Sequence, residues 1–272
     1  MNNIQHLFWL AVATLLLIIL EKIFPLRIPK HKYLPRLTIN FLMSILLYST
    51  ALLTVKPLSQ LGIVITSESN IGLLNLFNEW NNLTPGIRYL VGFLLMDLSF
   101  YYWHLLNHKV GWFWRFHVVH HIDPDLDVST SFRFHFVEVA YSMFFRFLQV
   151  LIIGVPLDLY VMYEYVFQIM TFFHHSNLRL PAKLDQMLNW IIVTPRMHGI
   201  HHSVLRAETN SNFSVVFSFW DRWHRTFVAK TRSQLIEIGV PGYSAPVDNS
   251  FESLILLPFK KQKAYWPSSD KS

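Results

Sequence analysis

The 272-residue sequence contains no cysteine, only 9 glycines, and charged side chains at only 15% of its positions. The absence of cysteine excludes a disulfide scaffold, cysteine-ligated iron–sulfur clusters, thiolate-ligated haem and thiol nucleophiles. The scarcity of glycine excludes collagen and glycine-rich linker proteins. A soluble globular domain carries charge on roughly a quarter of its residues, so this chain has too little charge for an ordinary solvated surface.

The composition is instead typical of a membrane protein. Apolar residues make up 52% of the chain and aromatic residues 16%. The formal net charge is +6, but the basic residues are scattered among apolar runs and form no stripe, so we expect no nucleic-acid partner. The chain also has 14 histidines, most of which fall between His104 and His202.

Five apolar runs predict membrane helices. Residues 4–20, 37–55 and 87–106 each predict a spanning helix. A cleavable signal peptide is disfavoured because no basic region precedes the first run. Residues 136–153 and 157–173 predict a helical hairpin, since the Gly-Val-Pro sequence between them breaks a helix. The fold class predicted is an all-α integral membrane bundle of three spanning helices plus a hairpin.

The basic residues indicate how these helices cross the membrane. The connection between the first two runs is rich in lysine and arginine, which is typical of cytosolic loops. We therefore expect this connection in the cytosol, with the N-terminus and residues 56–86 on the other side. The clustered histidines would all lie on the cytosolic side. Because no C-terminal retention signal is visible, a bacterial inner membrane is favoured over the endoplasmic reticulum.

We expect one domain over residues 1–272, without internal repeats beyond the histidine clusters. It would comprise N-terminal membrane helices at 1–86, a histidine-rich catalytic core at 87–228 and a tail at 229–272. From residue 174 the mixture of apolar and polar residues predicts a cytosolic cap with short helices. The tail contains several Pro and Gly residues and is expected to be mostly irregular, with its apolar run 253–259 at the membrane interface.

The histidines are grouped as a metal site requires. Three clusters have the necessary spacing: His104 and His108; His117, His120 and His121; and His198, His201 and His202. Residues three and four apart share a helix face, so each cluster directs two or three imidazoles at one point. The HxxHH pattern occurs twice, which is very improbable by chance.

Three further histidines are candidates for the same site. His175 follows the hairpin and is expected to join the clusters, whereas the role of His174 stays open. For His135 three roles stay open: a metal ligand, a donor that supports a ligand, and a packing residue.

These imidazoles are too many for one ion. A structural zinc takes four ligands and a catalytic zinc three, so the number indicates two metal ions with open positions. Imidazole binds iron, zinc, copper and nickel alike. A site at the ends of membrane helices is accessible to lipids, whose unactivated C–H bonds need oxygen activated by a redox metal. Zinc cannot do this, so two irons are favoured.

Two other classes of protein stay open. A membrane zinc carrier or sensor would use the same imidazoles, although transport favours ligands spread along helices near the midplane. A bis-histidine haem protein needs facing pairs of histidines, not HxxHH triplets.

The order of these motifs resembles the fatty acid hydroxylase and sterol desaturase superfamily of integral-membrane di-iron enzymes. The similarity is carried by segments 97–104, 114–121, 129–138, 175–178, 194–203, 212–214 and 220–221. The chain departs from the family pattern at 220–227, where TrpAspArgTrpHisArgThrPhe replaces TrpAsp-x-x-PheGlyThr, and at Ser214, where a glycine is common. The first departure puts the local turn in doubt.

The resemblance implies nine metal ligands: His104, His108, His117, His120, His121, His175, His198, His201 and His202. It also implies O2 as oxidant and a lipid substrate, such as a sterol, a fatty acyl lipid or an alkylglycerol lipid, that is hydroxylated or desaturated. Hydroxylation is favoured because most relatives hydroxylate. Since the chain has no dinucleotide fingerprint and no cysteine cluster, we expect electrons from a separate donor protein or a diffusible reductant.

Besides His135, three polar residues near the motifs are candidates for catalytic support. Asp97 lies two turns before the first motif in an apolar span, where it either bonds another helix or contacts a ligand histidine. Glu138 is expected to orient His135 or Arg133. Asn212 is expected to approach a metal through water.

Overall fold

The computed structural model describes residues 3–76, 85–229 and 236–266, and its regular elements are helices. The long helices are α1 (Asn3–Ile23), α2 (Tyr33–Leu53), α3 (Val55–Ser69), α5 (Pro85–Lys109), α7 (Phe136–Ile153) and α8 (Leu157–His175). The short α-helices are α4 (Leu73–Leu76), α6 (Gly111–His121), α9 (Ala182–Leu188), α10 (Pro195–His201), α11 (Arg206–Thr209), α12 (Phe219–Trp223) and α13 (Phe251–Leu256). The predicted all-α class is confirmed.

Three stretches of the described chain are long and apolar enough to cross a bilayer: Tyr33–Asn75, Gly86–Lys109 and Phe136–Ile153. Exposed leucine, isoleucine and phenylalanine side chains cover the outer faces of these helices, as contact with lipid requires. Helix α1 forms over the first predicted run, and its crossing of the membrane stays a prediction. Helix α8 forms the second arm of the hairpin, but its polar residues keep it from being one of the three stretches.

The predicted break between α7 and α8 is confirmed. Helix α7 ends at Gly154, whose φ of 76° is left-handed, and Pro156 precedes the first turn of α8. Gly154 also packs directly on Gly72, where an added Cβ would lie 2.4 Å from the Gly154 Cα atom. Both glycines are therefore required where this turn meets the end of α3.

The expectation that residues 56–86 lie outside the membrane stays a prediction, although helix α3 belongs to the apolar stretch Tyr33–Asn75. This helix continues α2 after an interruption at Thr54 and makes its most extensive contacts with α7, one of the apolar spans. Small residues Ser59, Gly62 and Thr66 form its buried face. Small side chains let membrane helices approach closely, and Gly62 lies directly against Phe147 and Val150 of α7. Residues 77–84 lie outside the described part.

The tail is more ordered than expected. Residues Tyr243, Leu254 and Leu257 belong to a buried cluster with Met43 of α2 and Trp114 of α6. The run 253–259 forms the end of α13 and the short 3-10 helix Leu257–Phe259, which contacts α6, and its expected place at the membrane interface stays a prediction. In the tail, single aromatic and aliphatic residues alternate with turn residues and show no helical period. The sequence therefore could not predict that the tail packs on α2 and α6.

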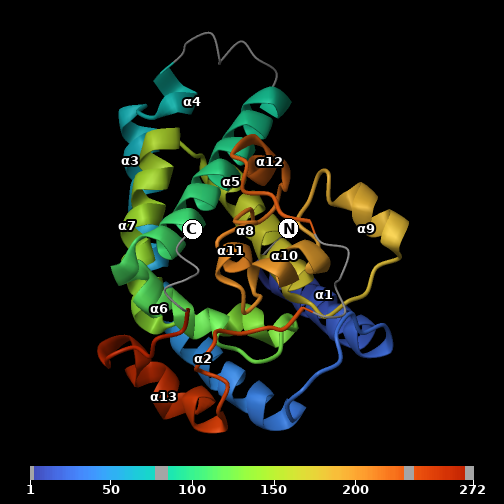
Figure 1. Ribbon diagram of the computed structural model, residues 1–272. Helices are drawn as coiled ribbons and strands as arrows, with labels where there is room; N and C mark the ends of the chain where they lie inside the picture. Colours follow the sequence, from blue (N-terminus) through green and yellow to red (C-terminus); the bar gives the residue numbers. More distant parts are fainter. Residues whose placement is uncertain (1–2, 77–84, 230–235, 267–272) are drawn as a thin grey trace.

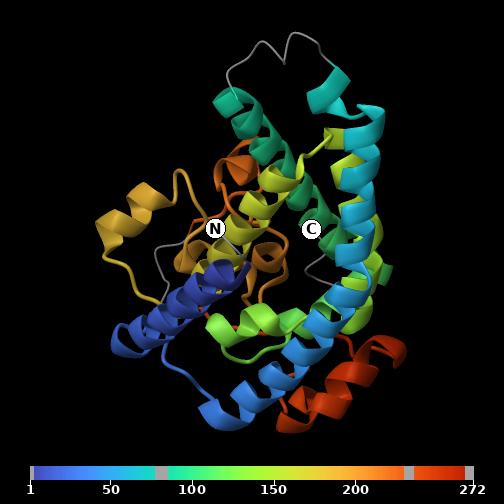
Figure 2. The ribbon, with the colours of Figure 1, turned by 180° about the vertical axis from the view of Figure 1, so that it is seen from behind.

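The helices form a bundle, with α4 at the upper end and α6 and α13 at the lower end in Figure 1, and α9 to α12 beside the long helices. Figures 1 and 2 show α3 and α7 side by side along one edge, with α5 and α8 crossing beside them. Helix α6 lies across the end of this bundle, next to α2 and α13, and α10 packs on the end of α8. The histidine motifs of α5, α6, α8 and α10 are thereby carried to one end of the molecule.

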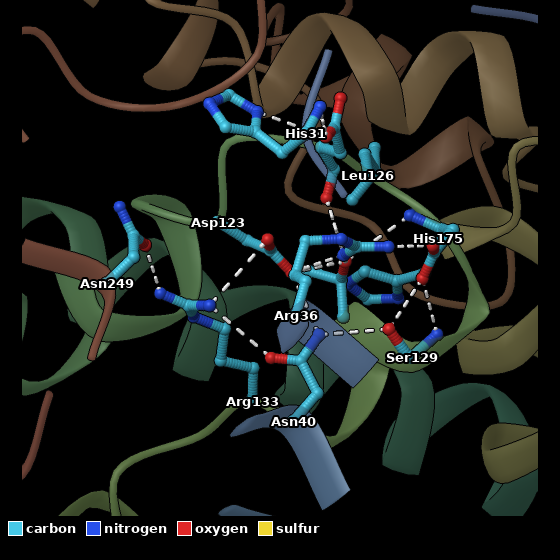
Figure 3. A network of polar contacts seen from close by, with 12 residues as sticks. His31, Arg36, Asn40, Asp123, Leu126, Ser129, Arg133, His175 and Asn249 are labelled. Carbon is cyan, nitrogen blue, oxygen red and sulfur yellow. Dashed lines mark hydrogen bonds and ion pairs between the residues drawn. The ribbon is translucent and has the colours of Figure 1, made fainter. Parts of the chain in front are cut away.

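A buried carboxylate fastens the segment that follows α6 to helix α2. Asp123 is fully buried between two guanidiniums: it pairs with Arg36 at 2.9 Å and lies 3.6 Å from Arg133 (Figure 3). It also accepts hydrogen bonds from Asn40 (3.1 Å) and Thr130 (2.8 Å). Burial alone would raise the pKa of Asp123, but the two arginines outweigh it and hold that pKa below its ordinary value.

Replacing Asp123→Asn is expected to lower the free energy of unfolding by about 3–5 kcal/mol, because buried Arg133 loses its carboxylate partner and buried Arg36 keeps only its pair with Asp127. Since the folded carboxyl has a lowered pKa, its contribution is present above the unfolded pKa and is lost as pH falls through the folded one. The difference in the free energy of unfolding between wild type and variant should therefore become smaller at acidic pH. Chemical unfolding in detergent at several pH values measures both effects.

The matched control is Glu237→Gln, which removes an acid whose pair with Lys30 is exposed on both sides. This change should cost less than about 1 kcal/mol. Equal losses in the two variants would show that the Asp123 network does not stabilise the fold.

Candidate metal centre

The structure brings nine histidines together in two neighbouring groups. The first group contains His104, His108, His117, His121 and His201, and the second contains His120, His175, His198 and His202. Within each group the potential ligand atoms all lie within 4.8 Å of one another. These are the nine histidines that the motifs single out, and they come from helices α5, α6, α8 and α10. Seven of them are buried, and His104 and His108 are partly exposed.

Backbone carbonyls orient several of these rings. The Nδ1 atom of His104 donates to the carbonyl of Phe213 at 2.8 Å, and that of His201 donates to the carbonyl of Ser211 at 2.7 Å. His175 does the same with the carbonyl of Thr171 at 2.7 Å. A carbonyl can only accept, so Nδ1 carries the proton and Nε2 is left with a bare lone pair. That lone pair is the atom a metal binds.

The first group fits a metal ion because several of its ring nitrogens are buried without a hydrogen-bond partner in the described part of the chain. The buried Nε2 atoms of His108, His117, His121 and His201 have no hydrogen-bond partner within the described residues. A buried polar atom without a partner is costly, so four of them converging on one place require an electrophile. The donor set of five imidazoles suits a divalent transition metal.

The second group fits in a different way. The Nε2 atom of His175 lies 3.0 Å from that of His120 and 3.0 Å from that of His198, which is 3.1 Å from the Nε2 atom of His202. Nitrogens bound at right angles about 2.1 Å from one ion would be separated by about 3.0 Å. The four rings are thus already spaced as ligands of a common ion.

Five of the nine clustered histidines resist protonation. Burial first, and then the neighbouring imidazoles, lower the pKa values of His120, His121, His198, His201 and His202 well below the ordinary value. Each ring is therefore neutral at physiological pH, which is the form that binds metal.

Glu138 supports a histidine of the first group. Its Oε1 atom lies 2.8 Å from Nδ1 of His117, and both side chains are buried. A carboxylate behind an imidazole fixes the ring with Nε2 bare and raises its basicity. The sequence placed Glu138 near the site but predicted His135 or Arg133 as its partner, so this pairing could not be read from spacing alone.

Asp97 holds the fold around the site and contacts no clustered histidine through its hydrogen bonds. Its carboxylate accepts from the Trp220 indole at 2.9 Å and from the backbone N–H groups of Val216 and Phe217. It also accepts from Tyr163 of α8 at 3.5 Å. Of the two roles left open, bonding to other segments is the one the structure shows. Asp97 fastens the loop before α12 to helices α5 and α8.

His135 and Asn212 also have structural partners. The Nδ1 atom of His135 accepts from the N–H of Val137 at the start of α7, and its Nε2 atom donates to the carbonyl of Ile255 at 3.1 Å. Both ring nitrogens are therefore occupied, and His135 lies in neither histidine group. The Asn212 side chain bonds the backbone of Met197 and Val228, so its expected approach to a metal is not favoured.

The turn at 220–227 forms despite its departure from the family pattern. Asp221 accepts from the backbone N–H groups of Phe213 and Ser214 and from the Thr226 hydroxyl. Arg225 occupies the position of the family glycine and adopts its left-handed backbone, with φ of 59°. The hydrogen bonds of Asp221 hold the turn that the missing glycine put in doubt.

An apolar cavity of about 240 Å³ leads from the membrane helices to the histidines. Its walls include Phe100 and Trp103 of α5 and Phe167 of α8, and Leu47 of α2. Five of the nine clustered histidines line it: His104, His117, His120, His175 and His198. Both groups therefore face the same space.

His174 also lines this cavity but belongs to neither group. Its Nδ1 atom donates to the carbonyl of Val215 at 3.1 Å, and its ring lies 4.2 Å from that of His198 between centroids. His174 therefore packs beside the second group. The cavity also includes Arg146 and Glu164, which sequence reasoning missed although charged residues in apolar segments are a signal of function.

Comparison with known proteins identifies relatives of this chain. The chain is 27% identical over 184 residues to an ornithine lipid hydroxylase of Rhizobium tropici, covering 67% of this chain and 54% of that protein. It is 28% identical over 163 residues to the alkylglycerol monooxygenase of Homo sapiens, covering 60% and 34%. It is 30% identical over 139 residues to the cholesterol 25-hydroxylase of Homo sapiens, covering 47% of each chain. The matches span about half the length of these relatives or less.

No solved structure matches the chain. Residues 89–226 match the fatty acid hydroxylase family, and this segment includes all nine clustered histidines. The superfamily resemblance seen in the motifs is confirmed, and the chain belongs to the fatty acid hydroxylase family.

Proposed function

We propose that this chain is a membrane-bound di-iron enzyme that uses O2 to hydroxylate a C–H bond of a lipid. The observation that carries the proposal is the shared cavity, which is walled by membrane helices and ends at histidines of both groups. The names of the relatives, which are hydroxylases and monooxygenases of lipids, agree with it. A carrier would need a path across the membrane, whereas the two groups gather at one end of the helices.

The nine histidines would hold two irons, five in the first group and four in the second. Bound iron would supply redox chemistry, by which a lipid C–H bond, O2, two electrons and two protons give a C–OH group and water. The electrons would come from a separate donor protein or reductant. We retain the proposals that residues 1–272 act as one domain and that the histidines face the cytosol.

The chain's own residues perform the other tasks. Carbonyls of Thr171, Ser211 and Phe213 keep three rings aimed inward. Phe134 stacks on the His120 ring at 4.2 Å between centroids and closes that side of the cavity. Aromatic walls of this kind bind an alkyl chain and keep water away from the reacting carbon.

The test measures metal and product together. Protein purified in detergent is expected to contain about two irons per chain, and with ¹⁸O2, a reductant and a lipid extract it should give a labelled hydroxylated lipid. His108→Ala and His198→Ala, one from each group, should each lose about one iron, because each removes one of the few ligands an ion has. Elemental analysis and mass spectrometry measure these outcomes.

His31→Ala is the matched control, since this histidine is outside both groups and pairs with Asp125 at the surface. Its iron content should equal that of wild type. Protein loaded with two irons that forms no O2-dependent product contradicts the enzyme proposal, and stable binding of zinc alone would favour the carrier. A product two hydrogens lighter than its lipid would indicate desaturation.

Glu138→Ala is expected to weaken metal binding by the first group about 10–100-fold, because His117 loses the carboxylate that orients it. Glu138→Gln should lie in between, since an amide oxygen still accepts from Nδ1. Competition with a chelator measures the two affinities. Glu252→Ala, an exposed acid on α13, is the control. Equal weakening of both groups would show that Glu138 acts on the fold and not on His117.

A further inference from the structure

An ion pair lies near the middle of the membrane hairpin. Arg146 of α7 pairs with Glu164 of α8, and the side chains are 4% and 39% exposed. Arg146 is near the centre of the apolar span Phe136–Ile153, and Glu164 is near the centre of α8. Both line the cavity that ends at the histidines. Charged residues at such depth are costly and mark functional sites by default.

Arg146 has more contacts with other protein groups than Glu164 has. The Arg146 guanidinium donates to Gln149 at 2.7 Å and to Tyr160 at 3.4 Å, and it lies 4.7 Å from the Phe100 ring centroid. Protein contacts thus engage the guanidinium beyond its pair with Glu164. Glu164 keeps more than a third of its side chain exposed while facing the cavity. The pair therefore presents a carboxylate acceptor, held charged by a buried arginine, to whatever enters.

Polar residues continue along the same face of α8. Glu164, Gln168 and Thr171 are four and three residues apart, which places them on one helix face, and all three line the cavity. The stripe ends at His175 of the second histidine group. Across the cavity, Phe100 and Trp103 of α5 form an apolar wall. The cavity is therefore amphipathic, which a plain hydrocarbon substrate would not need.

We propose that the Arg146–Glu164 pair binds a neutral hydrogen-bond donor of the lipid substrate, a hydroxyl or amide N–H group, through the Glu164 carboxylate. This inference rests on the proposed function. A hydrogen bond to an ionised carboxylate is about twice as strong as a neutral one. The pair has no net charge, so a charged headgroup would leave one charge uncompensated there, whereas a neutral donor does not.

The pair would also fix which carbon is oxidised. Arg146 lies eight residues beyond Glu138 on α7, which corresponds to about 12 Å of helix. Glu164 lies eleven residues from His175 on α8, or about 16 Å. The substrate class is therefore a lipid with a hydroxyl or amide donor roughly 12–16 Å from the oxidised C–H bond.

Binding without turnover tests the inference. The full chain loaded with zinc, which cannot oxidise the probe, is titrated with hexadecan-1-ol and with its methyl ether, which lacks the donor proton. Wild type should prefer the alcohol at least about tenfold, the ratio one charge-assisted hydrogen bond supplies. The double variant Arg146→Met/Glu164→Leu should bind both probes equally. Replacing both ions by apolar residues of similar volume avoids leaving a buried charge and keeps the fold.

Asp158→Asn is the matched control, because this acid is also on α8 but does not line the cavity. It should keep the preference of wild type. Equal binding of the two probes by wild type, or an unchanged preference in the double variant, overturns the inference.

A second measurement separates this inference from the proposed function. With iron, O2 and reductant, wild type should oxidise hexadecan-1-ol at one or two adjacent carbons, and the double variant should spread oxidation along the chain. Oxidation at the same carbons in both proteins overturns the inference and leaves the function intact. A preference for the alcohol in the zinc protein, with no product from the iron protein, supports the inference and contradicts the function.

Discussion

The structure depends on the burial of imidazole Nε2 atoms that carry no proton, four of which have no hydrogen-bond partner among the residues that the structure describes. Bare lone pairs in a dry interior are unfavourable unless an electrophile is present, so the histidine groups and their metal ions would stabilise each other. The carbonyls of Thr171, Ser211 and Phe213 impose this state by taking the proton of the opposite nitrogen. The loops after α10 therefore serve the centre through their backbone, which explains why ordered short segments surround the cluster.

Polar groups within the apolar helices act as connectors between segments that hydrophobic contact alone would not align. Asp97 joins α5 to α8 and to the loop before α12. Gln149 of α7 donates to the carbonyl of Met96 and to the hydroxyl of Ser99 on α5. In a membrane such hydrogen bonds have little competition from water. They fix the position of one helix along another, which contacts between apolar side chains alone do not specify. The helix ends that carry the histidines are aligned by these bonds.

The sequence predicted what short-range spacing determines. Residues three and four apart share a helix face, so the three motifs could be recognised as converging, and the Gly-Val-Pro break fixed the hairpin. Partners distant in sequence could not be predicted. Nothing near Glu138 shows that it meets His117, and nothing in α3 shows that Gly62 faces α7. The sequence showed that burying the Asp97 carboxylate in an apolar span is unfavourable, but only the fold shows which groups hydrogen-bond to it.

The cavity and the two histidine groups together restrict how a lipid can lie. His108, His121, His201 and His202 do not line the cavity, whereas both groups contribute other rings to its lining. A lipid chain that enters this cavity between the helices would therefore meet rings of both groups. One fixed end leaves the chain free to slide, so a second contact is needed to select a carbon. The Arg146–Glu164 pair is the charged feature of the cavity at the right depth to provide it.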